Sequence, residues 1–373
     1  MQKIQSKLKL LFIFSILFFL SGCEEFKDVD KDVFVSMIGI DLSEDKDKPY
    51  KVILKLFVPT SSFKQNPEAN YTYLVEKGET LSEAIRMLET HIDKELDFGH
   101  MKLIVIGEEL INNNKTKEIL DFLLRRPDIQ LISWITVGRP NAEEIVKMVP
   151  AGETAAYPSL YNYFDGNGTE SPYIVTTFLF DFRRRMMDNG LDPILPIVQV
   201  SENKTTFTVN KSFVLKDKKT PFELDSLSTL VFNTLSMNVQ MADIEVNEEN
   251  ELFVARLDKI KAKNKVKVQK DKQVSFEIDA ELIGYIAESK NTLDMRDLPR
   301  YSKLLEKEAK DKITKFMKLL QSEGIDPIGF GLKYRAQTLH HKRMSTEEWK
   351  EAYKNADVKV MVSASLKSTG SIQ

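Results

Sequence analysis

The feature that most constrains this chain is its cysteine content, because Cys23 is the only cysteine among 373 residues. It follows an apolar run from Leu10 to Leu20 that only Ser15 interrupts, and residues 1–9 carry three lysines and no acidic residue. A basic start, a short apolar run and small residues behind it are typical of a secretory signal peptide. The run is shorter than the ~20 apolar residues of a membrane-spanning helix. We therefore interpret residues 1–22 as a signal peptide.

The end of this segment, Leu20-Ser21-Gly22-Cys23, fits the lipobox of bacterial lipoproteins. The fit implies that the Cys23 thiol receives an S-diacylglyceryl group, that the chain is cleaved before Cys23, and that the new amino terminus is N-acylated. The alternative is an ordinary signal peptide with a cysteine there by chance. Two or more acyl chains hold a protein stably on a membrane, whereas one binds only marginally. We expect Cys23 to be a lipid anchor.

Cleavage would leave 351 of the 373 residues, which is enough for two or three domains with sizeable cores. With its thiol acylated, the mature chain has no cysteine for disulfides, thiolate catalysis or zinc sites. Without the three lysines of residues 1–9, it has 50 basic against 56 acidic residues. This balance argues against a nucleic-acid-binding protein, which would carry a dominant basic patch. We expect no nucleic-acid partner and a folded body at the membrane surface.

Periodicity predicts an α+β fold with three mixed α/β domains, the last an antiparallel sheet packed by a long helix. The first, residues 23–190, alternates strands with helices. Thr80 and Glu83 have the spacing of a capping box, and Asn141 is a further helix-cap candidate. The expected strands of this domain are 34–42, 50–58, 101–107 and 129–138, and the expected helices are 81–95, 114–124 and a short one after Asn141.

The composition changes at residues 188–190, and we place a domain boundary there. Residues 191–245 read as a small α+β domain with a hairpin turn near "KDKK" and a helix capped by Asp225. Residues 246–373 contain three strand-like stretches with one apolar face. A helix follows from about 298 to 323, with Gly324 as its C-cap, and a last strand ends the chain.

The motifs of common catalytic and metal sites are absent. The four histidines, His91, His100, His340 and His341, are not in a zinc-binding spacing. The chain also lacks a Gly-x-Ser-x-Gly elbow and a phosphate-binding Gly-x-x-x-x-Gly-Lys loop. We therefore expect no catalytic residue, no metal ligand and no cofactor. A surface-attached hydrolase stays an alternative, although it would lack a recognisable nucleophile or metal set.

Three stretches are candidates for contacts with other molecules. Arg183, Arg184 and Arg185 either face anionic headgroups or form a solvated edge between domains. Residues 148–168 carry Tyr157, Tyr161, Tyr163 and Phe164 in a polar loop, which either binds a partner or covers the first domain's core. We interpret residues 322–335, "SEGIDPIGFGLKYR", as a structural connection and not as a phosphate-binding loop. Gly329 and Gly331 permit tight backbone contact, and no strand precedes them.

The order of these features resembles the Ger(x)C family of spore germination lipoproteins, the C subunits of nutrient germinant receptors. The resemblance covers nearly the whole mature chain. It rests on the lipobox at Cys23, on the buried strand that ends at Gly107, and on the long helix, Trp349 and the last strand. It also rests on four segments that follow in the same order. These are "VFVSMIGIDLSED" (33–45), "RRPDIQLISWITVG" (125–138), "SFVLKDKKTPFEL" (212–224) and "GIDPIGFG" (324–331).

The resemblance implies a non-enzymatic protein of three α+β domains on the outer face of the spore's inner membrane. It implies two integral membrane partners, an A subunit and a transporter-like B subunit, in a complex that senses amino acids, sugars or nucleosides. The competing hypothesis is a solute-binding lipoprotein of an uptake system. Such a protein would have two α/β lobes around a cleft, which the C-terminal third of this sequence disfavours.

Overall fold

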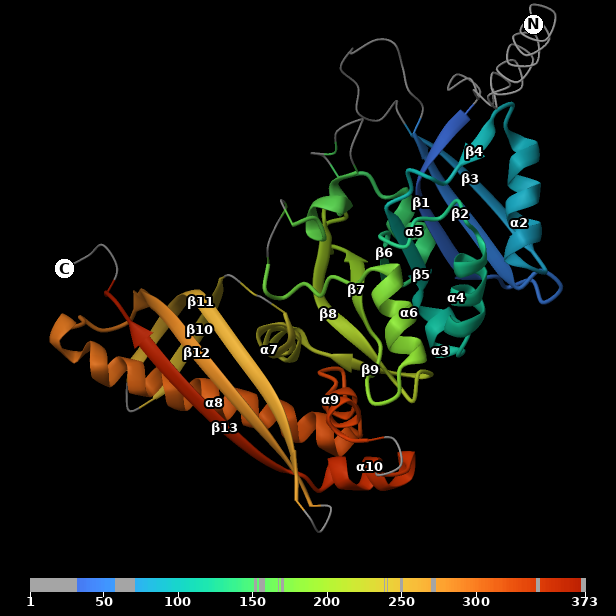
Figure 1. Cartoon of the computed structure of the whole chain (residues 1–373). Coiled ribbons are helices and arrows are strands. Elements are labelled where there is room, and N and C mark those ends of the chain that lie inside the picture. The colour runs from blue at the N-terminus through green and yellow to red at the C-terminus, as the bar shows by residue number, and fades with distance from the viewer. Residues whose placement is uncertain are drawn as a thin grey trace, which may run out of the picture.

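The computed structural model describes residues 32–57, 71–150, 153, 158–166, 168, 171–237, 239, 241–248, 251–269, 273–339 and 343–369. Within these ranges the strands form two sheets. The sheets lie at opposite ends of the molecule, with helices α7 (Ser226–Ser236) and α9 (Phe330–Gln337) between them (Figure 1). Cys23, and with it the predicted signal peptide, lies outside the described residues.

In the described part of the chain, nine strands form the first sheet, in the order β3-β2-β1-β5-β6-β7-β8-β9, with β4 paired to β1. Strands β1, β5, β6 and β7 run parallel to one another, and antiparallel strands extend the sheet on both sides. The strands are β1 (Asp32–Leu42), β2 (Tyr50–Phe57), β3 (Tyr71–Gly78), β4 (Glu95–Asp97), β5 (Leu103–Gly107), β6 (Trp134–Arg139), β7 (Ile194–Val200), β8 (Phe207–Lys216) and β9 (Thr220–Leu224).

Helices pack on both faces of this sheet, as the near-continuous apolar pattern of its central strands requires. One face packs against α2 (Leu81–Leu88), α4 (Thr116–Arg125) and the inner side of α6 (Leu179–Met187) in a single hydrophobic core. The other face packs against α5 (Ala142–Lys147) and the 3-10 helix Ser159–Tyr163 in a second core. Helix α3 (Glu108–Asn112) follows β5 directly.

Local sequence signals set several helix boundaries as expected. The Thr80 hydroxyl accepts a hydrogen bond from the Glu83 backbone N–H at 3.1 Å, and the Asn141 side chain accepts one from Glu144 at 2.8 Å. These bonds satisfy amides that a helix start leaves without intrahelical partners. The helix expected at 114–124 starts two residues later, at Thr116, because Asn114 has a left-handed backbone with φ 57°.

The strand expected at 129–138 is too long at its start, because β6 begins only at Trp134. Residues 130–133 instead form turns, and the side chains of Leu131 and Ile132 are exposed. Apolar composition alone does not distinguish a buried strand from an exposed apolar turn. The turn therefore presents two apolar side chains on the surface of the protein.

The second sheet has the order β10-β11-β12-β13, and α8 (Leu298–Glu323) packs along it. Its strands are β10 (Ala242–Glu248), β11 (Glu251–Val268), β12 (Val274–Ser289) and β13 (Asp357–Leu366). The predicted α+β fold with a long helix on an antiparallel sheet is thereby confirmed. The last strand differs in one respect, since β13 runs parallel to β12. Helices α8, α9 (Phe330–Gln337) and α10 (Thr346–Lys354) form the long crossover that a parallel pair requires.

The segment predicted as a middle domain, residues 191–245, does not form a sheet of its own. Strands β7, β8 and β9 are hydrogen-bonded into the first sheet, which therefore crosses the boundary predicted at residue 190. Helix α7 (Ser226–Ser236) lies in a core that also contains Val214 of the first sheet, Phe276 of the second sheet and Phe316 of α8. The three-domain division stays a prediction, but the two sheets share this core.

Candidate docking site at the junction of the two sheets

Residues 322–335, which we predicted to be a structural connection, lie where the part of the chain with the second sheet meets the part with the first sheet. Gly324 ends α8 with a left-handed backbone, φ 67°, and Gly329 starts α9 with φ 83°. Between them, the Asp326 carboxylate accepts hydrogen bonds from the backbone N–H groups of Gly329 and Gly331, both at 2.7 Å. The carboxylate therefore holds the turn that separates the two helices.

Two glycines bring the backbones of the two parts into direct contact. The Gly190 carbonyl accepts a hydrogen bond from the Leu332 N–H at 2.8 Å. A Cβ atom added to Gly331 would lie 2.6 Å from Gly190 Cα, which is closer than two non-bonded carbon atoms approach each other in folded proteins. Gly190 also has a left-handed backbone, with φ 84°. A side chain at either position would push the two parts of the molecule apart.

Asp192 completes this contact from the side of the first sheet. Its Oδ2 accepts a hydrogen bond from the Asp326 N–H at 2.7 Å, and its own N–H donates to the Asp326 carbonyl at 3.0 Å. Both carboxyl groups are withdrawn from water, so burial raises the pKa of Asp192 and raises the pKa of Asp326 to about 7. Two acidic groups with raised pKa values thus meet at the junction.

The arginine triplet is divided between two roles. Arg185 is buried, pairs with Asp181 at 2.7 Å, and donates to the carbonyl of Pro327 at 3.0 Å and that of Asp192 at 3.2 Å. It therefore ties the two parts together as a buried residue, whereas the interdomain interpretation predicts a solvated edge. Arg183 and Arg184 point outward and remain exposed.

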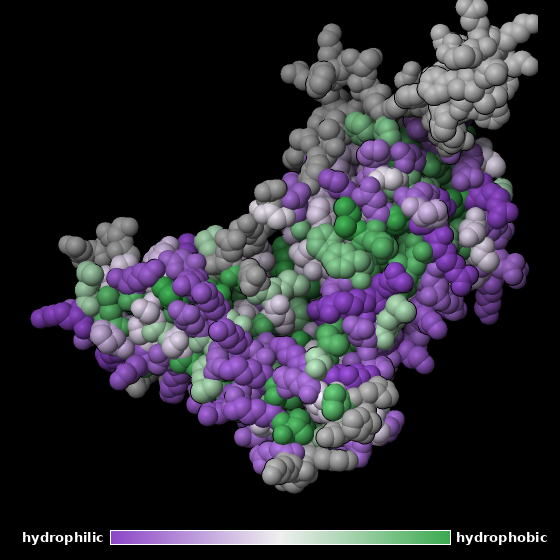
Figure 2. Space-filling model, viewed as in Figure 1, coloured by the Kyte–Doolittle hydropathy of each residue, from purple (hydrophilic) through white to green (hydrophobic). Residues whose placement is uncertain are grey.

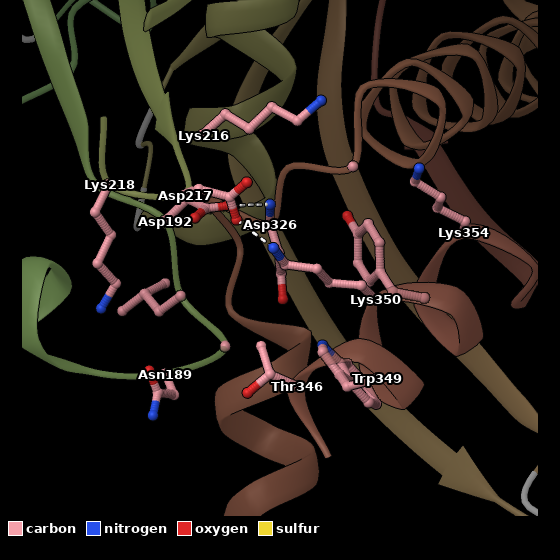
Figure 3. A pocket seen from close by; sticks show the side chains of 14 residues that line it. Asn189, Asp192, Lys216, Asp217, Lys218, Asp326, Thr346, Trp349, Lys350 and Lys354 are labelled. Carbon is pink, nitrogen blue, oxygen red and sulfur yellow. Dashed lines mark hydrogen bonds and ion pairs between the residues drawn. The ribbon is translucent and has the colours of Figure 1, made fainter. Parts of the chain in front are cut away.

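A pocket of about 420 Å³ opens beside this contact (Figure 3). The tip of the β8–β9 hairpin, where Asp217 and Lys218 both have positive φ, forms one wall. Lys350 of α10 reaches across and donates to Asp217 Oδ1 at 2.5 Å. Trp349, with its ring stacked on Tyr334 at 4.6 Å, forms the floor. Charged side chains around the aromatic rings of Trp349 and Tyr353 suit the docking of a charged segment or small polar molecule.

The aromatic loop covers a core and does not present a binding surface in the described residues. Tyr161 and Phe164 are buried, and both rings pack against Trp134. The Tyr161 hydroxyl donates to the Ser36 carbonyl, and the Tyr163 hydroxyl donates to Phe207 at 3.0 Å. Of the two alternatives for this loop, the core-covering one holds for these residues. Tyr157 lies outside the described residues.

The described histidines are exposed and lie apart. His91 follows α2 and lies 3.6 Å from Glu76, whereas His100 lies 3.3 Å from Asp97 with its ring against Phe34. His340 and His341 fall outside the described residues. Within the residues described, no group of three or more histidine or acidic side chains is placed to hold a metal ion.

Sequence reasoning missed a buried ion pair. Lys55 of β2 is 1% exposed, and its Nζ lies 2.5 Å from Glu153, which also accepts a hydrogen bond from the Ser159 hydroxyl at 3.0 Å. Burial lowers the pKa of Lys55, and the Glu153 charge opposes that effect. No local signal identifies this lysine as buried, because a lysine in an alternating strand normally faces water.

Among the residues that the structure describes, no helix is long and apolar enough to span a membrane. Two family models match nearly all of the chain after Cys23. "Spore germination protein N-terminal domain" matches residues 25–200, and "Spore germination B3/GerAC like, C-terminal" matches residues 210–370. The two sheets and their junction are thus those of a spore germination protein of the GerAC type. The chain belongs to the Ger(x)C family.

Named relatives span the whole chain at low identity. Spore germination protein GerQC of Bacillus cereus is 25% identical over 92% of this chain and 95% of its own length. Spore germination protein B3 of Bacillus subtilis is 21% identical over 96% of this chain and 98% of its own. The crystal structure of the GerBC protein matches with a TM-score of 0.59 at 17% identity, covering 88% of this chain and 97% of that one. The fold is therefore shared with GerBC.

Proposed function

We propose that this protein is a lipid-anchored, non-enzymatic subunit of a nutrient germinant receptor. It sits on the outer face of the spore's inner membrane through Cys23 and works with the integral membrane A and B subunits. The observation that carries the proposal is the family match, which runs through residues 25–200 and 210–370.

The geometry suits an assembly subunit. Eight residues would separate Cys23 from Asp32, the first described residue of the first sheet. Figure 1 places the second sheet at the opposite end of the molecule from the start of β1. The hydrogen bonds of Asp192, Asp326 and Arg185 fix the angle between the two parts. The protein would hold its second sheet, and the junction pocket, at a set distance from the lipid.

The test is a germination assay on spores that lack this gene. Each candidate nutrient is supplied in turn, and calcium dipicolinate serves as a trigger that bypasses nutrient receptors. We expect loss of the response to one nutrient class while the bypass remains intact. Restoring the gene with Cys23→Ala should give a protein that leaves the membrane fraction and does not restore the response.

Two results would count against the proposal. Full germination with an unlipidated, soluble Cys23→Ala protein would remove the need for the anchor. Loss of solute uptake by vegetative cells, with normal germination, would favour the solute-binding alternative. Calorimetric binding of that solute to the isolated protein would then identify its ligand.

A further inference from the structure

The outer face of α6 carries an unusual combination of side chains. Phe180, Arg183, Arg184 and Met187 have the i, i+3, i+4, i+7 spacing that places residues on one side of a helix. All four are exposed, with Phe180 at 46% and Met187 at 68%. The opposite side of α6 holds Leu179, Phe182 and Arg185, which are buried.

The exposed turn before β6 lies against the start of this helix. The Phe180 N–H donates to the Leu131 carbonyl at 2.9 Å, and the Leu179 N–H donates to Ser133 at 2.8 Å. Leu131 and Ile132 are 42% and 65% exposed. Figure 2 shows hydrophobic residues gathered on this face of the molecule, around the start of α6. We call Leu131, Ile132, Phe180, Arg183, Arg184 and Met187 the α6 face.

Single exposed apolar side chains are common on proteins, but a contiguous group rimmed by polar residues marks an interaction surface. The exposed side chains of α6 are not part of the hydrophobic core, in which Leu179 and Phe182 occupy the inner side of the helix. Arg184 pairs with Asp181 at 2.7 Å, whereas Arg183 has no ion pair with any residue that the structure describes. The α6 face is thus apolar with local positive charge, on a chain whose net charge is −3.

The α6 face lies near the end of the sheet that leads to Cys23. Met37, Leu103 and Trp134 are paired across the parallel strands β1, β5 and β6. Trp134 lies level with Met37, and Asp32 precedes Met37 by five residues, so Asp32 lies roughly 17 Å further toward the end at which β6 begins. Two strand spacings, roughly 10 Å, separate the two residues sideways. The eight residues between Cys23 and Asp32 span at most about 28 Å.

A bilayer that holds the acylated Cys23 can therefore also touch the α6 face. We propose that the α6 face docks on the membrane, with Ile132, Leu131 and Phe180 entering the headgroup region and Arg183 and Arg184 binding anionic headgroups. The inference rests on the lipid anchor of the proposed function, which would keep the protein at the membrane. It adds the orientation of the protein on the bilayer. With this face on the lipid, the first sheet lies against the bilayer.

The chemistry of the surface supports a lipid occupant. Large apolar side chains with nearby basic residues are the composition of protein surfaces that lie in the membrane interface. Each arginine near an anionic surface strengthens binding about fivefold, and the anchor keeps the α6 face near the lipid at high effective concentration. Two arginines would therefore change the ratio of docked to undocked protein by about 25-fold.

The test uses the single-cysteine chemistry of the chain. In the lipidated protein Cys23 is blocked, so Ile132→Cys introduces one thiol that can carry an environment-sensitive fluorophore. The labelled protein is placed on vesicles of phosphatidylglycerol and phosphatidylethanolamine that contain spin-labelled lipid as quencher. Met361→Cys on β13, exposed at 40%, is the matched control site on the second sheet. We expect a blue shift and quenching at position 132 and neither at position 361.

Arg183→Gln with Arg184→Gln should lower the docked fraction at position 132, as should vesicles of phosphatidylcholine alone. A label at position 132 that stays as unquenched as the control would overturn the proposal. So would a label that becomes shielded only after the membrane subunits are added, because the α6 face would then be a protein-docking surface.

Two measurements distinguish a missing lipid on Cys23 from a failure of the α6 face to dock. The mass of the N-terminal peptide reports whether Cys23 carries lipid. A Cys23→Ala protein that carries Ile132→Cys is measured in parallel at high vesicle concentration. Binding that requires phosphatidylglycerol and shifts the emission at position 132 would support docking even without an anchor. No shift in this protein and none in the lipidated one would refute docking, whatever the state of Cys23.

Discussion

The acidic pair at the junction makes the stability of the protein depend on pH in an unusual direction. Burial raises the pKa of Asp326 from 3.8 to about 7, so the folded protein holds the proton of this carboxyl group more tightly than the unfolded chain does. The stabilisation is complete below the unfolded pKa and is lost as pH rises through the folded pKa. Three pKa units correspond to about 4 kcal/mol, of which about 2.5 kcal/mol is lost between about pH 5 and pH 8. Asp192 adds to this loss with the same sign, because its pKa is also raised.

The variant Asp326→Asn removes the ionisation and keeps the shape of the side chain. Because Asn has one carbonyl oxygen, one of the two amides of Gly329 and Gly331 loses its acceptor, at a cost of about 1–3 kcal/mol. The wild-type protein should therefore be the more stable of the two near pH 5. Its advantage should shrink by about 2.5 kcal/mol on going to about pH 8, since only the wild-type carboxyl group must ionise while buried.

Urea unfolding at several pH values in this window measures both proteins. Trp349 reports on the junction, because it lines the pocket beside Asp326 and stacks on Tyr334. Its signal is isolated by Trp134→Phe, a tolerable change because the indole N–H of Trp134 has no hydrogen-bond partner among the described residues. Groups that titrate elsewhere cancel in the difference between the two proteins. A difference in the free energy of unfolding that is constant with pH, or that grows as pH rises, would refute the reasoning.

Three further changes test the packing of the molecule. Gly331→Ala should cost roughly 2–3 kcal/mol in urea unfolding, because its Cβ would meet Gly190 backbone at 2.6 Å. Gly166→Ala, with nothing within 4 Å of its Cβ, is the matched control, and equal losses would contradict the close contact. Glu153→Gln should cost about 3–5 kcal/mol by leaving the Lys55 charge buried and unpaired. Adding Lys55→Met should recover much of that loss, and simple additivity of the two changes would argue against the pairing. Ser345→Ala should lower stability by about 1 kcal/mol through loss of the α10 capping box, and an unchanged thermal midpoint would show that the cap contributes nothing.

Several parts of this protein follow from short stretches of sequence. The caps at Thr80, Asn141 and Asp225 stand where the sequence places them, because a cap needs only a side-chain oxygen and an amide two or three residues away. Gly324 ends the long helix for a similarly local reason, since a left-handed residue suits glycine. The prediction that residues 324–331 belong to a structural connection also rested on local turn chemistry.

The tertiary structure alone decided the features that join distant residues. Asp192 and Asp326 are 134 residues apart and meet through two hydrogen bonds. Lys55 is buried because Glu153, 98 residues later, supplies its partner. Strands β7, β8 and β9 extend the first sheet because β7 pairs with β6, a choice that their own alternation does not specify. Periodicity states which face of an element is apolar, but it does not state which other element covers that face. That choice depends on packing over the whole chain. Several helices and many strands were therefore predictable from the sequence, whereas the contacts at the junction were not.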